Sequence, residues 1–313
     1  MTARPIIIDT DPGQDDAVAI LLALASPQEL EVIGITAVAG NVPLALTEKN
    51  ARRVCELAGR PDIKVYAGAE RPLILPLQTA EAVHGSTGLN GPDLPEPKMK
   101  TSPGHASDFL VETLRARQAG TVTLCLLGPH TNLALAMVKA PDIVPRIREI
   151  VLMGGAVFEG GNSTPSAEFN LLVDPHAADV VFRSGVPITV MPLDVSHKAL
   201  TTRVRIDRIR ALGTPVATAV VKMLEFFERY DEQKYGTDGA PLHDPCVISF
   251  LLQPGLFKGR KVNVAIETAS PLTIGMTVTD WWKVTDRAPN ATVMTEIDAD
   301  AYYNLLTERL ARF

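Results

Sequence analysis

The sequence is poor in cysteine and aromatic residues, and it lacks long hydrophobic and basic runs. Of 313 residues, three are cysteines, and aromatic side chains make up only 5%. The longest apolar run, Ala17 to Ala25, is about half of the roughly 20 residues that a helix needs to cross a membrane. A net charge of −6 without a basic run argues against a surface for nucleic acid or a membrane. The composition is that of an ordinary globular chain.

The few cysteines and the first residues bear on the compartment in which the protein works. Cys55, Cys125 and Cys246 are widely spaced, odd in number and set among apolar residues, which predicts reduced cysteines in the core. Only three isoleucines precede Asp9, and no small-residue cleavage site follows, so we expect no signal peptide. These features together predict a cytoplasmic protein.

Strand-like and helix-like segments alternate along the chain. The expected strands are residues 5–9, 31–38, 62–67, 121–127, 149–153, 187–191, 261–268 and 291–297, and the expected helices are residues 17–25, 44–58, 106–119, 131–139, 175–184, 214–230 and 300–312. Such alternation predicts right-handed crossovers and an α/β fold, an open and mostly parallel sheet flanked by helices. No domain linker is evident, which predicts a single domain over residues 1–313. The long irregular stretch 72–103 is typical of a functional loop or lid.

Four aspartates lie within eight residues, directly after the first expected strand. Asp9, Asp11, Asp15 and Asp16 would repel one another unless a positive charge lies among them. A divalent cation with oxygen ligands is the simplest solution. The alternative is an acidic helix start, since Asp15 and Asp16 suit the positive end of a helix dipole, but it accounts for only two of the four. The sequence therefore predicts a metal site at the edge where the parallel strands end.

Eight motifs follow one another along nearly the whole chain. They are DTDPGQDDA at 9–17, AVAGN at 37–41, HGSTGL at 84–89, GPHTN at 128–132, LMGG at 152–155, EFN at 168–170, DP at 174–175 and HDPC at 243–246. In this order they resemble the inosine–uridine family of nucleoside hydrolases. Residues 224–246 further resemble the bacterial pyrimidine-preferring ribonucleoside hydrolases. The resemblance implies the nucleoside hydrolase fold, with a Rossmann-like core.

The resemblance also implies a calcium ion at the bottom of the pocket. Its implied ligands are the carboxylates of Asp11, Asp16 and Asp244 and the main-chain carbonyl of Leu127, with Asp9 as a buried acceptor behind them. This set is all oxygen, which suits calcium or magnesium better than zinc or copper. The family usually has threonine where Leu127 stands, but a backbone ligand does not need that side chain.

The implied reaction is hydrolysis of the N-glycosidic bond of a ribonucleoside, which gives ribose and a free base by way of a calcium-bound water. Asp11 would take the proton of that water, and His243 would donate a proton or hydrogen bond to the leaving base. A structural role is the alternative for His243. The implied substrate-binding residues are Asp15, Asn41, His84, Asn162, Glu168, Asn170, Tyr230, Tyr235 and Asp244. His105, His130, His176 and His197 receive no part in the reaction.

Several questions stay open at this point. Cytidine and uridine are the expected substrates, and a broad or purine specificity is the alternative. A non-catalytic, calcium-dependent ribose-binding protein would share the ligand set but would not need Asp11 as a base. A magnesium-dependent phosphatase of the haloacid dehalogenase type would need a hydrophobic residue and Gly-Thr after Asp11, where this chain has Pro12-Gly13-Gln14. The expected partners are a small-molecule ribonucleoside and further copies of the chain, in a homodimer or homotetramer, with no nucleic acid or membrane.

Overall fold

The strands form one sheet, which confirms the predicted α/β architecture. The computed structural model describes residues 3–236 and 239–313, and the side chains of 231–235 lie outside this description. The nine-stranded sheet has the order β3-β2-β1-β4-β5-β6-β9-β7-β8. The strands are β1 (Arg4–Thr10), β2 (Leu30–Ala37), β3 (Val65–Ala67), β4 (Val122–Leu126), β5 (Ile147–Met153), β6 (Ile188–Met191), β7 (Phe257–Ile266), β8 (Thr277–Asp280) and β9 (Ala291–Ile297). The seven neighbouring strands β3, β2, β1, β4, β5, β6 and β9 are parallel to one another. Strand β7 is antiparallel to both of its neighbours, β9 and β8.

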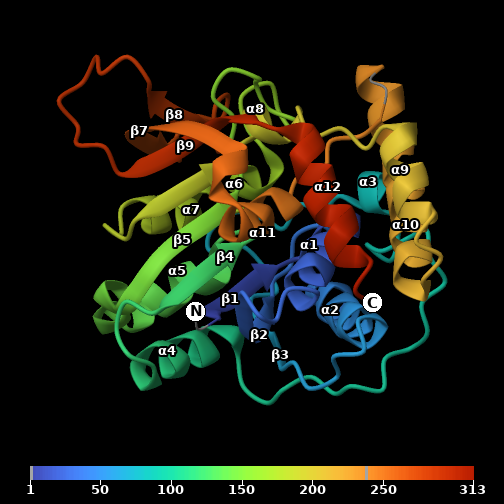
Figure 1. Cartoon of the computed structure of the whole chain (residues 1–313). Helices are drawn as coiled ribbons and strands as arrows, with labels where there is room; N and C mark the ends of the chain where they lie inside the picture. The colour runs from blue at the N-terminus through green and yellow to red at the C-terminus, as the bar shows by residue number, and fades with distance from the viewer. Residues whose placement is uncertain (1–2, 237–238) are drawn as a thin grey trace.

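Helices cover both faces of this sheet (Figure 1). They are α1 (Gln14–Leu24), α2 (Leu44–Leu57), α3 (Glu81–His84), α4 (Ala106–Ala116), α5 (Thr131–Lys139), α6 (Phe169–Val173), α7 (Pro175–Phe182), α8 (Leu193–Ser196), α9 (Arg203–Arg210), α10 (Pro215–Tyr235), α11 (Pro245–Leu252) and α12 (Ala299–Leu310), with 3₁₀ turns at Pro141–Arg146 and Pro254–Leu256. No helix among the described residues has the length and apolar character of a membrane span.

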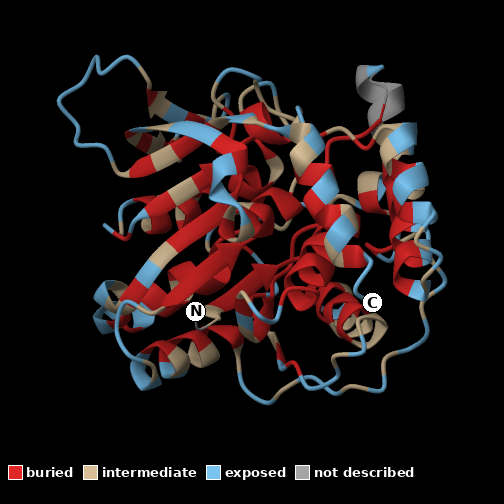
Figure 2. Ribbon diagram, viewed as in Figure 1, coloured by how far each residue is buried: buried red, intermediate tan, exposed pale blue. Residues whose placement is uncertain are grey.

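The core has two layers because successive strand residues point to opposite faces. In β1, Ile6 and Ile8 join the apolar cluster beneath α1, α2 and α9 to α12, while Ile7 joins the cluster beneath α4, α5 and α7. Burial on both faces explains why the central strands are almost continuously hydrophobic. Figure 2 shows these strands and α1 as the most deeply buried part of the molecule.

Helix α1 begins earlier than the apolar pattern predicts. The expected start was Ala17, but the first helical residue is Gln14, so Asp15 and Asp16 lie in the first turn. The Asp16 carboxylate accepts a hydrogen bond from the Gly13 amide at 2.9 Å, which caps the helix. The alternative for these aspartates, an acidic helix start, is therefore correct for both Asp15 and Asp16, and it does not exclude a metal.

Some elements were not predicted. Helices α9 and α11 and strand β8 carry no strong periodic signal, and the strand expected at 62–67 shortens to Val65–Ala67. The irregular segment 72–103 contains only the short helix α3, and residues 78–80 and 82–84 within it line the main cavity.

Candidate functional site

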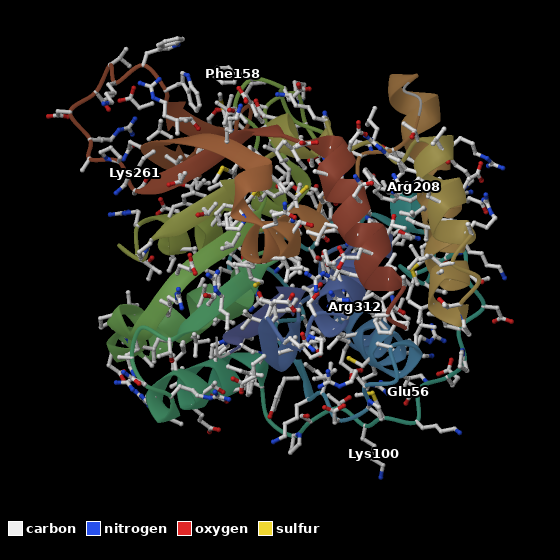
Figure 3. All side chains as sticks on the ribbon, viewed as in Figure 1. Glu56, Lys100, Phe158, Arg208, Lys261 and Arg312 are labelled. Atoms are coloured by element: carbon white, nitrogen blue, oxygen red, sulfur yellow. The ribbon has the colours of Figure 1, made fainter. Side chains whose placement is uncertain are left out.

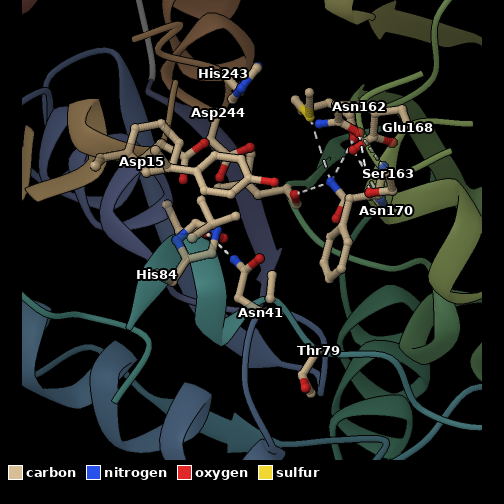
Figure 4. Close-up of a pocket in the computed structure, with 18 of the residues that line it drawn as sticks. Asp15, Asn41, Thr79, His84, Asn162, Ser163, Glu168, Asn170, His243 and Asp244 are labelled. Atoms are coloured by element: carbon tan, nitrogen blue, oxygen red, sulfur yellow. Dashed lines mark hydrogen bonds between the residues drawn. The ribbon is translucent and has the colours of Figure 1, made fainter. Parts of the chain in front are cut away.

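A cavity of about 370 Å³ opens beyond the carboxyl ends of the parallel strands. It is lined by nearly all the residues that the sequence nominates: Asp15, Asp16, Asn41, His84, Leu127, Asn162, Glu168, Asn170, Tyr230, His243 and Asp244. Asp15, Asp244 and His243 lie on one side, and Asn162, Glu168 and Asn170 lie on the other (Figure 4). Asp11 is not among the lining residues and is almost wholly buried. The side chain of Tyr235 lies outside the described residues.

Three buried carboxylates converge at the floor of the cavity. Asp15, Asp16 and Asp244 each offer an oxygen, and these oxygens lie within 4.8 Å of one another. Burial, and then the charge of Asp16, raise the pKa of Asp15 to about 8. Burial and the charges of Asp15, Asp16 and Asp11 hold the pKa of Asp244 well above its usual range. This group contains Asp15, which the sequence assigned to ribose, beside two of the three predicted carboxylate ligands.

The Asp11 carboxylate is held at the edge of this cluster by a main-chain amide and by close contact with two glycines. One oxygen accepts a hydrogen bond from the main-chain amide of Asn41 at 2.7 Å. A Cβ on Gly40 would lie 2.0 Å from the same oxygen, and a Cβ on Gly128 would lie 2.3 Å from the other. Burial and the charges of Asp16 and Asp15 raise the pKa of Asp11 well above its usual range. The two glycines are thus needed for the position of this carboxylate.

Asp16 and Asn41 connect the cluster to the start of α1. The Asp16 carboxylate accepts hydrogen bonds from the Thr10 hydroxyl and the Gly13 amide. The side-chain amide of Asn41 donates to Asp16 at 3.2 Å and to the main-chain carbonyl of Asp11 at 3.0 Å. Because its two hydrogens are used in this way, Asn41 holds both acidic groups in place.

The opposite wall is built around the carbonyl of Leu127. The Asn170 side chain donates to this carbonyl at 2.7 Å, which leaves the oxygen a second lone pair. Glu168 caps α6 by accepting from the Asn170 and Leu171 amides at 2.9 and 3.3 Å, and it also accepts from the Gly155 amide at 3.0 Å. Burial raises the pKa of Glu168 to about 7. Asn162 accepts from the Phe169 amide at 3.0 Å, so all three polar side chains are held by backbone near α6.

Asp9 lies behind the floor, as the sequence analysis expects. One of its oxygens accepts from Thr36 at 2.5 Å and from Asn132 at 2.7 Å. The other oxygen is buried and has no partner within the part of the chain that the structure describes. Burial raises the pKa of Asp9 to about 7.

Two histidines face the cavity from different elements, with Phe227 near both. Phe227 lies 5.5 Å from the ring of His84 and 6.4 Å from that of His243, between centroids. Burial lowers the pKa of His84 to about 3, and burial, followed by the nearby His197 and His84, lowers the pKa of His243 to about 3. Both imidazoles are therefore neutral at neutral pH. His84 ends helix α3 and is 7% exposed, so the loop that carries it is fixed at this point.

The sequence analysis missed His197 as a residue of this cavity. His197 lines it, and its ring lies 5.9 Å from that of His243 and 3.3 Å from a Glu159 oxygen, measured from Nδ1. Its one usable signal was its place shortly after β6, at the edge where ligands bind. His130, also without an assigned role, is buried outside the cavity lining, beneath Phe182.

Comparison with known proteins gives consistent matches over almost the entire chain. A family model described as inosine-uridine preferring nucleoside hydrolase matches residues 6–304. An uncharacterized protein of Schizosaccharomyces pombe is 52% identical over 98% of this chain and 99% of its own length. The pyrimidine-specific ribonucleoside hydrolase RihA of Salmonella gallinarum is 48% identical over 98% of each chain. Among solved structures, a purine-preferring ribonucleoside hydrolase from Gardnerella vaginalis superposes with a TM-score of 0.92 at 32% identity, covering 98% of each chain.

The glycines beside Asp11 give a first prediction. Gly40→Ala and Gly128→Ala should each lower the free energy of unfolding by about 1–3 kcal/mol, because the new methyl group must displace a buried carboxylate. Gly255→Ala is the matched control, since a Cβ there meets no atom within 4 Å. Denaturant unfolding of the three variants measures the difference. Equal stability of all three would show that Asp11 is free to move.

The raised carboxyl pKa values predict an unusual pH dependence for the protein freed of metal by a chelator. Asp9, Asp15 and Glu168 have pKa values of about 7, 8 and 7 in place of 3.8, 3.8 and 4.5. A raised carboxyl pKa stabilises the fold below the ordinary value, and this stability is lost as the pH rises through the raised one. The lowered pKa values of His84 and His243 have the opposite effect up to about pH 6.5, so the melting temperature should fall mainly between about pH 6.5 and pH 8. Added calcium should restore it most at the upper end, where fewer protons compete. A melting temperature that rises with pH, or that calcium leaves unchanged, would contradict the site.

Proposed function

The chain belongs to the inosine-uridine preferring nucleoside hydrolase family, and we propose that its substrates are pyrimidine ribonucleosides, which it cleaves to ribose and free base. As a family member it is an enzyme that hydrolyses ribonucleosides. The observation that carries the proposal is that the buried acidic floor, the asparagine and glutamate wall and two neutral histidines all line one cavity. The phosphatase and the non-catalytic binding protein are set aside by family membership.

The acidic floor is the proposed calcium site. Within the described residues, Asp15, Asp16 and Asp244 pair with no lysine or arginine, although their oxygens lie close together. Such a concentration of buried negative charge fits a hard cation, and every available donor is oxygen. Asp11, Asp16, Asp244 and the Leu127 carbonyl would hold the ion, with Asp15 near enough to join them. When bound, calcium supplies a positive charge that acidifies water and favours the paired hydroxyls of ribose over deoxyribose.

Asp11 is the proposed general base. Water attacks the anomeric carbon, the bond from this carbon to the base nitrogen breaks, and the proton of the water passes to the Asp11 carboxylate. A carboxylate raised in pKa by burial is a better proton acceptor than an exposed one, and Gly40, Gly128 and the Asn41 amide fix its position. The remaining carboxylates stabilise the positive charge that grows on the ribosyl ring.

His243 is the proposed donor to the leaving base. Its Nδ1 lies 2.7 Å from the Ser196 hydroxyl. If Ser196 donates in this contact, the single hydrogen of the neutral imidazole resides on Nε2, from which it can be donated in a hydrogen bond to the leaving base. Phe227 lies beside His243, and both Phe227 and Tyr230 line the cavity and offer aromatic surface for the base.

The preference for pyrimidines is supported by the relative at 48% identity, which is named as pyrimidine-specific. A purine or broad specificity is the second candidate, because the structural neighbour at 32% identity is named as purine-preferring. Release of ribose from uridine, cytidine, inosine and adenosine decides between them. We expect kcat/KM for the two pyrimidine nucleosides to be at least about tenfold higher, a difference of about 1.4 kcal/mol in transition-state binding. Higher values for inosine or adenosine would support the second candidate.

Asp11→Asn tests the general base. The variant keeps an oxygen near the metal but loses the proton acceptor, so kcat should fall by roughly two to four orders of magnitude. Binding of ribose, measured by calorimetry, should survive in part. A near-native kcat would remove Asp11 from this role.

His243→Ala tests the hydrogen-bond donor to the leaving base. The variant should lower kcat on uridine and leave KM little changed, because the interaction is confined to the transition state. A nitrophenyl riboside has a leaving group that needs no proton, so the variant should cleave it nearly as fast as the parent enzyme. Equal losses on both substrates would assign His243 a structural role and direct attention to Tyr230 and Tyr235.

We further propose that the chain assembles as a homodimer or homotetramer. Strand β8 ends the sheet, and beside it Leu272, Trp282 and Val284 are 83%, 76% and 83% exposed. Phe158 is 61% exposed at the surface of the molecule (Figure 3) and packs edge-on against Trp281, which follows β8 directly. An exposed sheet edge with apolar side chains is typical of an interface. Light scattering after gel filtration should give a multiple of 33.7 kDa, and a monomer at micromolar concentration would contradict the proposal.

The proposed location is the cytoplasm. Cys55, Cys125 and Cys246 are free and buried, as the sequence predicts. Burial raises the pKa of the Cys55 thiol to about 12, which keeps it protonated and unreactive. Reduced cysteines within a core are typical of a reducing compartment.

A further inference from the structure

Gln14 stands between Gly13 and the aspartate pair of the first motif. It is uncharged and completely buried. Its side-chain nitrogen donates to the main-chain carbonyls of His84 and Asn90, both at 3.0 Å. These two bonds use both hydrogens of the amide. Gln14 therefore connects the first turn of α1 to the segment that carries His84, 70 residues further along the chain.

The two donated bonds determine which way the amide points. If it were turned over, its oxygen would face two carbonyl oxygens, which is repulsive. The Gln14 oxygen must consequently face the His84 ring, whose Nδ1 lies 2.7 Å away. Since an amide oxygen can only accept, the hydrogen in this contact belongs to Nδ1 of His84.

The His84 ring is held on its other sides as well. A Cβ on Gly13 would lie 2.3 Å from Nδ1, so the ring packs directly on that backbone. Phe227 covers another side, with 5.5 Å between ring centroids. Within the described chain, Nε2 makes no hydrogen bond, although His84 lines the cavity. Because the pKa of His84 is lowered to about 3, the ring is neutral and has a single hydrogen, which the Gln14 contact takes up.

We propose that Gln14 is a positioning residue that fixes His84 as its Nδ1–H tautomer, so that Nε2 accepts a hydrogen bond from the substrate. This inference rests on the proposed function, since it requires a nucleoside in the cavity. The group that binds must be a neutral hydrogen-bond donor. Because the paired 2′- and 3′-hydroxyls are assigned to the calcium site, the remaining donors of uridine are the 5′-hydroxyl and the N3–H of the base. His243 differs, because its Ser196 partner can donate or accept and leaves the tautomer free to change. The two histidines thus offer the nucleoside an acceptor and a donor.

A purely structural role for Gln14 predicts a different behaviour. Asn50 provides the matched control, because its side chain donates to the Pro12 carbonyl at 3.1 Å and to the Thr87 carbonyl at 2.8 Å. It connects the same two parts of the chain without touching the imidazole. If Gln14 only anchored the segment, loss of either residue would have the same effect on His84.

Nuclear magnetic resonance of protein with ¹⁵N-labelled histidine distinguishes the two roles, with His84 assigned from a His84→Gln variant. In the parent protein, the His84 hydrogen should reside on Nδ1, with Nε2 bare. Gln14→Met should transfer a large part of the population to the Nε2–H tautomer, and Asn50→Leu should leave the parent pattern. A parent spectrum with hydrogen on Nε2, or an equal change in both variants, would overturn the proposal. Because the parent spectrum is informative by itself, the test does not depend on the folding of a variant or on activity.

Substrate analogues identify the donor. Gln14→Met should lower kcat/KM for uridine about tenfold, mainly through KM, because a buried donor of the substrate loses its defined acceptor. This loss should disappear with 5′-deoxyuridine if the 5′-hydroxyl is the donor, or with 3-methyluridine if N3–H is the donor. Equal losses on all three substrates would contradict the acceptor role. If the parent enzyme hydrolysed none of the three substrates, the proposed function would be contradicted and the tautomer result would stay valid.

Discussion

Repulsion among buried carboxylates at the end of β1 is the constraint on which the rest of the site depends. Asp15, Asp16 and Asp244 lie within 4.8 Å of one another, and Asp11 adds a fourth negative group at their edge. Amide donors from Asn41 and the capped start of α1 hold these groups but do not neutralise them. A bound cation is the partner that this negative charge requires, and Gly40 and Gly128 leave the space that Asp11 needs to approach the cluster.

The cavity has two regions that differ in charge. Its floor is negative and suits a metal, sugar hydroxyls and the cationic character of a ribosyl transition state. Its rim has the neutral imidazoles of His84 and His243 beside Phe227, which suits an uncharged base. A charged imidazole there would compete with the cation for the carboxylates, so the neutral state of these histidines suits both parts of the site.

The sheet and the residues that follow its strands could be predicted from the sequence, because buried parallel strands are nearly continuous apolar runs and their carboxyl ends meet at one edge. The relative positions of the side chains could not. The start of α1 depends on the Asp16 cap, which a hydrophobic pattern does not record. Contacts such as Gln14 with His84 join residues 70 apart, and His197 reaches the cavity from a turn without periodicity. These contacts depend on the tertiary structure and cannot be inferred from local sequence patterns.

Anomalous scattering from a crystal grown with calcium, measured at the floor of the cavity, tests the proposed cation site most directly. This site predicts one strong peak bound at about 2.3–2.6 Å by oxygens of Asp11, Asp16, Asp244 and the Leu127 carbonyl, the distances typical of calcium. Electron density for water alone, with the aspartates spread apart or paired with one another through shared protons, would contradict the claim that a cation holds this cluster together.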